Sequence, residues 1–199
     1  MPETAIYQIK ISLMGTRPLI WRRVLVPSNM TLQQLHRVIQ ATMGWYDSHL
    51  HEFTIGGEQY GMRDPDGGFM DDDPPRSERT ARLAGLLGWK GAKARYTYDF
   101  GDGWEHQIVV EKVLPPTADL ECPACIAGQL ACPPEDCGGV GGYYNLLEII
   151  GNPKHEEHDR MLEWLGGPLD PEAFSIEAAN ALLAPLRKVP KRKAAAGSG

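Results

Sequence analysis

No stretch of the sequence approaches the roughly 18 uninterrupted apolar residues that a membrane-spanning helix needs. A basic start followed by an apolar run of signal-peptide length is also lacking. These two absences predict a cytoplasmic protein that stays out of the membrane. The length of 199 residues and the apolar content of 42% favour one sizeable core, because two independent domains would be cramped.

Cysteine is scarce and confined to one short stretch of the chain. Its spacing is C-x2-C-x6-C-x4-C, formed by Cys122, Cys125, Cys132 and Cys137. In a reducing compartment such a cluster favours a metal site or reduced thiols over disulfides. The first pair has the spacing that lets two thiolates bind one tetrahedral Zn²⁺, whereas the second half fits less well. Zinc and simple packing of the thiols both stay open, and one thiolate could be replaced by His106, His155 or His158.

Acidic residues are absent from the last 13 positions, which carry five basic side chains. Without those five, 15 basic residues stand against 26 acidic ones, a net charge of −11 for residues 1–186. A body of this charge repels phosphate backbones, so a protein or small-molecule partner is favoured over nucleic acid. The segment 187–199 is predicted to be a disordered basic tail, and its Gly-Ser-Gly end is typical of a cloning remnant.

The first half of the chain predicts two paired strands and a helix. Apolar and polar residues alternate over 7–13, and a second β-rich run follows at 19–26. Thr31 and Gln34 have capping-box spacing, and an apolar stripe at helical intervals runs from there to Gly44. A third strand is expected over 50–55, and the Asp- and Pro-rich stretch 61–79 is expected to be a solvated loop.

The second half predicts a hairpin, a long irregular loop and further helices. A short helix over 80–87 leads to strands 95–100 and 105–114, joined by a Gly-Asp-Gly turn. The Cys-, Gly- and Pro-rich stretch 117–142 is too long for an idle connector, so metal binding or packing on the hairpin should organise it. Helices are expected over 143–150, from Asn152-Pro153, and from Ser175 to about Ala184. The prediction is therefore a single α+β domain, with a mostly antiparallel sheet, helices on one side and a Cys/Gly/Pro-rich loop.

Several residues that can transfer protons or bind metal surround the expected hairpin turn. His49 and His51 are two apart in an expected strand, so their side chains would share one face, as paired metal ligands would need. More often, one such histidine is a hydrogen-bonded core residue and the other is exposed. Asp99, Asp102 and His106 crowd the turn itself, where Asp and Gly are also ordinary turn formers. Glu135 and Asp136 are adjacent acids that could serve as base or ligand, although exposed loop acids are the commoner outcome. No complete catalytic set stands out, and the run Gly138–Gly142 lacks the Lys-Ser/Thr of a phosphate-binding loop.

Five segments in one order resemble the plasmid pRiA4b ORF-3-like family. They are Pro-Leu-Ile-Trp-Arg-Arg at 18–23, Met-Gly-Trp with His-Leu-His-Glu-Phe at 43–53, Tyr-Asp-Phe-Gly-Asp-Gly-Trp-Glu-His at 98–106, Pro-Pro-Glu-Asp-Cys-Gly-Gly at 133–139, and Trp164 before Asp-Pro-Glu-Ala-Phe at 170–174. The resemblance covers 6–183, and no single motif is as specific as this ordered set.

The resemblance implies an α+β fold, and family members are often carried by plasmids or transposons and labelled transposon passenger proteins. It also implies cysteines at Cys125 and Cys137, with Cys132 less regular and Cys122 commonly another residue. A metal would then be bound by Cys125 and Cys137 with His106 or His155, which requires the loop to fold back onto the hairpin.

Three functional hypotheses follow. The first is a non-enzymatic accessory or binding module, in which the Cys-rich loop and the aromatic hairpin form a recognition surface around zinc. The second is a small metal-assisted hydrolase that uses His49, His51, Asp99, Asp102 and His106 around an open metal position. The third is weak, salt-sensitive DNA binding through the basic tail.

Overall fold

The computed structural model describes residues 4–61, 74–116 and 121–187. In these ranges, eight strands form one sheet in the order β5-β4-β3-β6-β7-β1-β2-β8. Neighbouring strands run antiparallel except for β4 and β5, which are parallel. The strands are β1 (Ile6–Leu13), β2 (Ile20–Pro27), β3 (His51–Ile55), β4 (Glu58–Gly61), β5 (Arg76–Ser77), β6 (Lys93–Tyr98), β7 (Trp104–Leu114) and β8 (Ala124–Gln129).

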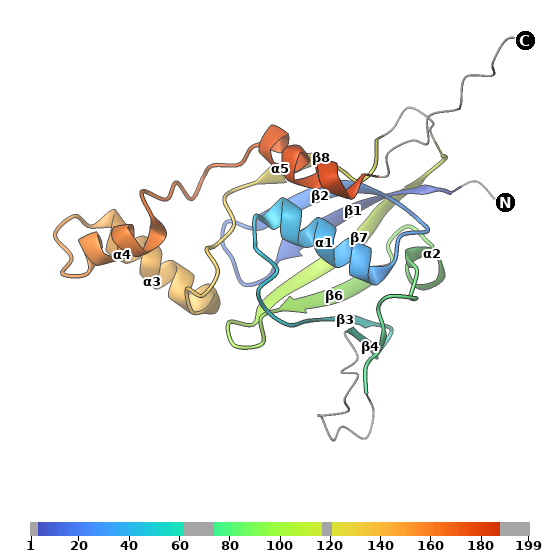
Figure 1. Cartoon of the computed structure of the whole chain (residues 1–199), viewed down its shortest axis with the longest axis horizontal. Coiled ribbons are helices and arrows are strands. Elements are labelled where there is room, and N and C mark those ends of the chain that lie inside the picture. The colour runs from blue at the N-terminus through green and yellow to red at the C-terminus, as the bar shows by residue number, and fades with distance from the viewer. Residues whose placement is uncertain (1–3, 62–73, 117–120, 188–199) are drawn as a thin grey trace, which may run out of the picture.

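Helices cover one face of this sheet, so the expected α+β architecture with helices on one side is confirmed (Figure 1). Helix α1 (Leu32–Met43) lies across the strands, and α5 (Ile176–Leu183) packs against α1 and β8. Helices α3 (Gly139–Gly151) and α4 (His158–Leu165) pack on each other beyond the strands, at the left of the view. The short α2 (Leu83–Leu86) and a 3-10 turn (Ala184–Leu186) complete the set. None of the helices in the described ranges is long and apolar enough to cross a membrane.

Alternation of buried and more exposed side chains along the strands explains why the helices pack on this face. In β1, the side chains of Ile9, Ile11 and Leu13 are fully buried toward α1, whereas Lys10 between them is only half-buried. Strand β7 repeats the pattern with Trp104, His106, Ile108 and Val110 in the core. An antiparallel sheet with one covered and one open face produces this period of two.

Helix α1 begins and ends where the sequence predicts. The Thr31 side chain accepts a hydrogen bond from the Gln34 amide, and the Gln34 side chain accepts one from the Thr31 amide, so the capping box is complete. At the other end, Gly44 is left-handed at φ 86°, a conformation that glycine adopts without strain. The predicted strand pair β1–β2, the hairpin β6–β7 and the Ser175 cap of α5 are confirmed as well.

Four sequence expectations are wrong in detail. The stretch 117–142 is not one irregular loop, because β8 inside it pairs with β2 at the sheet edge. Helix α3 begins at Gly139 instead of Tyr143. Asn152 ends α3 rather than starting a helix: its side chain accepts a hydrogen bond from the Lys154 amide in a turn, and α4 starts only at His158. The predicted loop 61–79 contains β5 and lies partly outside the described residues.

Candidate functional site: the bend between β6 and β7

The turn between β6 and β7 is organised by Asp99, which adopts a left-handed conformation at φ 55°. Its Oδ1 atom accepts a hydrogen bond from the Gly101 amide at 2.9 Å, the local pattern that lets aspartate stabilise a tight turn. The Asp99 amide donates to the carbonyl of Leu50 at 2.9 Å, which ties the turn to the segment before β3. This arrangement leaves the Oδ2 atom of Asp99 directed toward His49.

The segment from Pro133 to Gly138 folds back onto this turn. The Asp102 carboxylate accepts a hydrogen bond from the Gly138 amide at 3.1 Å, and the Trp45 indole donates to the Pro133 carbonyl at 2.9 Å. The approach is so close that a Cβ atom on Gly139 would lie 2.3 Å from the carbonyl oxygen of Asp102. The expectation that the loop after β7 packs on the hairpin turn is therefore confirmed for residues 133–139.

His49, Asp99 and Asp136 meet at this junction, and we call them the bend site. The Nε2 atom of His49 lies 3.1 Å from Asp136 Oδ1 and 3.7 Å from Asp99 Oδ2. Their potential ligand atoms all lie within 4.8 Å of one another. The side chains of Asp99, His49 and Asp136 are 12%, 27% and 68% exposed, so the site opens toward solvent on the Asp136 side. His49 Nε2 is shielded from solvent yet forms no well-aligned hydrogen bond, which leaves a donor nitrogen without a fixed partner.

One imidazole and two carboxylates form a donor set that suits Zn²⁺ and related divalent ions. Three protein ligands leave at least one coordination position for water or another molecule, as in zinc sites that remain open. Without an ion, the carboxylates of Asp99 and Asp136 would compete for a single hydrogen-bond donor, His49 Nε2. The residues of the bend site therefore fit a divalent metal.

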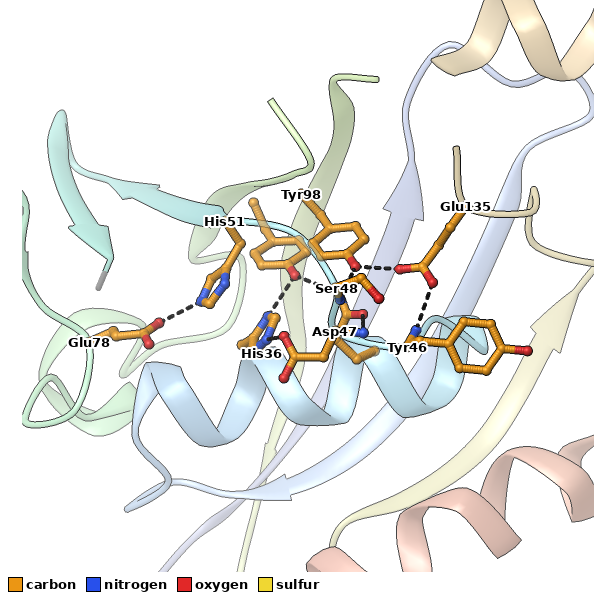
Figure 2. A network of polar contacts seen from close by, with 10 residues as sticks. His36, Tyr46, Asp47, Ser48, His51, Glu78, Tyr98 and Glu135 are labelled. Carbon is orange, nitrogen blue, oxygen red and sulfur yellow. Dashed lines mark hydrogen bonds and ion pairs between the residues drawn. The ribbon is translucent and has the colours of Figure 1, made fainter. Parts of the chain in front are cut away.

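Glu135, next to Asp136, also holds the segment 133–139 in place through contacts with Tyr98 and Tyr46 (Figure 2). Its carboxylate accepts hydrogen bonds from the Tyr98 hydroxyl and from the Tyr46 amide, the latter at 3.1 Å. Burial, followed by the Glu135 carboxylate, raises the pKa of Tyr98 above its usual value. The Tyr98 hydroxyl thus keeps its proton and donates it to Glu135.

A second group of histidines is buried between α1 and the sheet. The His36 and His51 rings stack with centroids 3.5 Å apart and planes 3° from parallel. His36 Nε2 lies 2.6 Å from Asp47, and His51 Nε2 lies 2.8 Å from Glu78 (Figure 2). Burial, and then the neighbouring His51, lower the pKa of His36 to about 4. Because nitrogen lone pairs lie in the ring plane, two parallel stacked rings cannot point at one ion, and this group does not fit a shared metal.

The structure separates His49 from His51, so the expectation that they share one face is wrong. The commoner outcome is found instead: His51 is a hydrogen-bonded core residue, and His49 is more exposed. Strand β3 starts only at His51, whose side chain enters the core, while His49 precedes the strand and turns to Asp99 and Asp136. His106 is fully buried, with its Nδ1 atom 3.0 Å from the Trp104 carbonyl oxygen. Burial lowers the His106 pKa to about 4. Of the predicted catalytic candidates, His49 and Asp99 lie together in the bend site. Asp102 is not part of that group but binds the Gly138 amide and so holds the segment that carries Asp136.

The four cysteines are free thiols that the fold does not gather into one set. In the described ranges, the groups of three or more potential metal ligands include no cysteine. Cys125 is buried in β8 at the far edge of the sheet, whereas Cys137 lies beside the bend. Burial, with Asp102 and Asp136 nearby, raises the pKa of Cys137 to about 12. His155 lies in the α3–α4 link, where its Nδ1 accepts a hydrogen bond from the Glu157 amide.

Other predicted features divide between core and surface. Trp45, Trp104 and Tyr143 are buried, whereas Trp89 and Trp164 are exposed. Arg187, the first residue of the predicted tail, contacts Glu121, Asn180 and the Pro123 carbonyl. The remainder of that tail, 188–199, lies outside the described residues.

Sequence reasoning noted Asp136 only as one of two loop acids and did not consider His36. The available signal for Asp136 was its place in Pro-Pro-Glu-Asp-Cys-Gly-Gly, two residues before a glycine run that permits close packing. For His36, the signal was a histidine on the apolar stripe of an otherwise regular helix.

Comparison with known proteins identifies the family. The model of the family described as plasmid pRiA4b ORF-3-like protein matches residues 5–178, which include every residue of the bend site. The chain belongs to the plasmid pRiA4b ORF-3-like family.

Two relatives of this pRiA4b ORF-3-like protein show how far the likeness extends. It is 40% identical over 163 residues to the uncharacterized protein y4hQ of Sinorhizobium fredii, which covers 81% of each chain. It is also similar to the crystal structure of a protein of unknown function, MM3350 of Methanosarcina mazei, with a TM-score of 0.77 and 42% identity. That match covers 88% of this chain and 96% of the other. The fold is therefore shared over nearly the full length of the solved relative.

Proposed function

We propose that this pRiA4b ORF-3-like protein is a metal-binding accessory module, with Zn²⁺ bound by His49, Asp99 and Asp136. The observation that carries the proposal is the convergence of these three donors from three separate segments within 4.8 Å. This retains the binding-module hypothesis but moves the metal away from the cysteines. In the described residues no cysteine belongs to a group of three or more potential ligands, so the imidazole and the two carboxylates are the better ligands.

The metal would also link three segments of the chain that are separate in the sequence. His49 precedes β3, Asp99 follows β6, and Asp136 belongs to the segment that folds back onto the turn. An ion bound by all three would join that segment to the sheet, and the Asp136 side chain reaches solvent. Phe100, which follows Asp99, and Tyr46, whose amide donates to Glu135, are both exposed. A partner molecule that supplies one donor atom could then complete the coordination and contact these aromatic side chains.

Zinc titration by isothermal calorimetry tests this proposal. The wild-type protein, stripped of metal, should bind one Zn²⁺ per chain. His49→Ala and Asp136→Asn, which remove ligands, should each weaken binding by more than the roughly 10–100-fold that loss of an outer-shell partner costs. His158→Ala is the matched control, because His158 forms a comparable pair with Asp159, at 2.9 Å, on α4 away from the bend. Cys125→Ser and Cys137→Ser should bind zinc as the wild type does. Loss of zinc in the cysteine variants, with normal binding in His49→Ala, would move the site to the thiols.

Metal-assisted hydrolysis is a second candidate, favoured by the number of protein ligands. Three ligands and a solvent-facing position resemble zinc sites that activate a bound water. The chain's own contribution would be to hold the ion through His49, Asp99 and Asp136, because both Glu135 carboxylate oxygens already accept hydrogen bonds from Tyr98 and Tyr46. Hydrolysis of bis-p-nitrophenyl phosphate and p-nitrophenyl acetate by the zinc-loaded protein, absent in His49→Ala, would support it. Equal turnover by the wild type and by His49→Ala would reject hydrolysis at this site, and only the metal-binding role would remain.

A further inference from the structure

His36 and Gln40 on the buried side of α1, together with Tyr96 and both the carboxylate and the backbone amide of Asp47, form a closed ring of hydrogen bonds that we call the Asp47 circuit. His36 Nε2 lies 2.6 Å from Asp47 Oδ1, and His36 Nδ1 lies 2.8 Å from the Tyr96 hydroxyl. The Gln40 side-chain nitrogen donates to the same hydroxyl at 3.1 Å, and the Gln40 side-chain oxygen accepts from the Asp47 amide at 3.1 Å. Figure 2 shows the part of this ring around His36 and Asp47.

Only one arrangement of protons satisfies every member of the circuit. The Asp47 carboxylate can only accept, so His36 Nε2 carries a proton and donates it. Since the Gln40 amide already donates to the Tyr96 oxygen, the Tyr96 hydroxyl is free to donate its own proton to His36 Nδ1. His36 is therefore the neutral Nε2–H tautomer. A second proton on Nδ1 would leave the buried Tyr96 hydroxyl proton without its acceptor.

The circuit holds Asp47 in the left-handed region, which aspartate visits more readily than most residues but which still costs free energy. Asp47 is left-handed at φ 60°, a strained region that persists only when its surroundings hold it. Helix α1 supplies the restraint from two positions one turn apart, His36 to the carboxylate and Gln40 to the amide. Both α1 side chains are buried, so they are themselves held in place by packing.

Asp47 sits at the centre of a short segment whose backbone amides are all bound. The Trp45 amide donates to the Gln40 carbonyl, the Tyr46 amide to Glu135, and the Ser48 amide to the Tyr98 hydroxyl. His49 follows Ser48, so the backbone conformation at Asp47 directs the chain that carries the His49 ring.

The geometry points to His36 as a positioning residue: through the Asp47 circuit it sets the position of His49 in the bend site. The metal readout below depends on the proposed function, whereas the structural readouts do not.

Three substitutions at Asp47 separate the hydrogen bond from the backbone conformation. Asp47→Asn keeps an acceptor oxygen and tolerates the left-handed region. Asp47→Gly adopts that region without strain but removes the acceptor, and Asp47→Ala loses both. His36→Phe removes the donor while it preserves a planar ring in the core.

Hydrogen exchange of the Ser48 and His49 amides, followed by NMR on the metal-free protein, gives the first readout. We expect exchange in Asp47→Asn to match the wild type, and exchange in Asp47→Gly, Asp47→Ala and His36→Phe to be at least tenfold faster. The His36 ring nitrogens should show the neutral Nε2–H pattern in the wild type and in Asp47→Asn. An Asp47→Gly variant that exchanges like the wild type, or a wild-type His36 protonated on Nδ1 at pH 7, would overturn the inference.

Zinc affinity gives the second readout. Affinity should stay within about twofold of the wild type in Asp47→Asn and fall by about 10-fold or more in Asp47→Gly and His36→Phe, the range typical of residues that orient a metal ligand. A wild type that binds no zinc rejects the proposed function alone, because the amide exchange still tests the circuit. Zinc binding that stays equal in all four variants rejects the positioning role and leaves the metal site intact.

Discussion

The carboxylate of Asp102, in the turn after β6, accepts a hydrogen bond at 3.1 Å from the amide of Gly138, at the start of α3. These two residues are 36 positions apart, and their contact brings Asp136 to His49 and Asp99. The bend site therefore exists only while the segment 133–139 stays docked.

Glycine is required at position 139 for the docking. A Cβ there would lie 2.3 Å from the Asp102 carbonyl oxygen, and the residue is left-handed at φ 68°. Gly139→Ala should lower the free energy of unfolding by about 2 kcal/mol or more, measured by urea denaturation, because both strain and the clash add up. Gly141→Ala is the control, because nothing lies within 4 Å of its Cβ position. It should be neutral or stabilising within the helix. Equal effects at both positions would show that the close approach does not matter.

Glu135→Gln should loosen the same segment. The glutamate uses both carboxylate oxygens, one for the Tyr98 hydroxyl and one for the Tyr46 amide, and glutamine has only one acceptor oxygen. The loss should cost about 1–3 kcal/mol in urea denaturation. The exposed Glu148→Gln in α3 should change nothing measurable. Unchanged stability of Glu135→Gln would mean that the segment is held without this carboxylate.

Acid should destabilise the protein through its buried neutral histidines. The pKa of His106 is lowered to about 4 by burial, below its value of about 6.5 in an unfolded chain. Between these values the unfolded state binds more protons, so stability is full above pH 6.5 and is lost as the pH falls toward 4. A shift of this size corresponds to roughly 3 kcal/mol.

His106→Leu isolates this contribution to the pH dependence. The wild type should lose more stability than the variant between pH 7 and pH 5, when both are followed by denaturant unfolding. Carboxylates titrate in both proteins, so their effects cancel in the difference. Parallel curves for the two proteins would contradict the lowered pKa.

Much of the fold follows from local patterns in the sequence. The alternation over 7–13, the capping box at Thr31 and Gln34, and the Gly-Asp-Gly turn each encode their element directly, and each of these elements forms as expected. Strand β8 escaped prediction because its short, Gly- and Cys-containing sequence has little strand character of its own. Pairing with β2 supplies the hydrogen bonds that make it a strand.

The site was only partly predictable for a related reason. Asp99 and Asp102 lie within the turn motif, where their proximity is a matter of sequence. Asp136 reaches His49 only through long-range docking, which depends on the close approach at Gly139 and on the Glu135 contacts. The spacing of the cysteines suggested zinc, but β8 carries Cys125 to the far edge of the sheet, away from Cys137. Spacing alone does not encode that separation.

Anomalous diffraction at the zinc absorption edge, from crystals of the metal-stripped protein soaked in zinc, tests the central claim most directly. The account predicts one strong peak about 2.0–2.2 Å from His49 Nε2 and from a carboxylate oxygen of both Asp99 and Asp136. A peak at the sulfur atoms of Cys132 or Cys137, or no peak near His49 at a saturating zinc concentration, would contradict it.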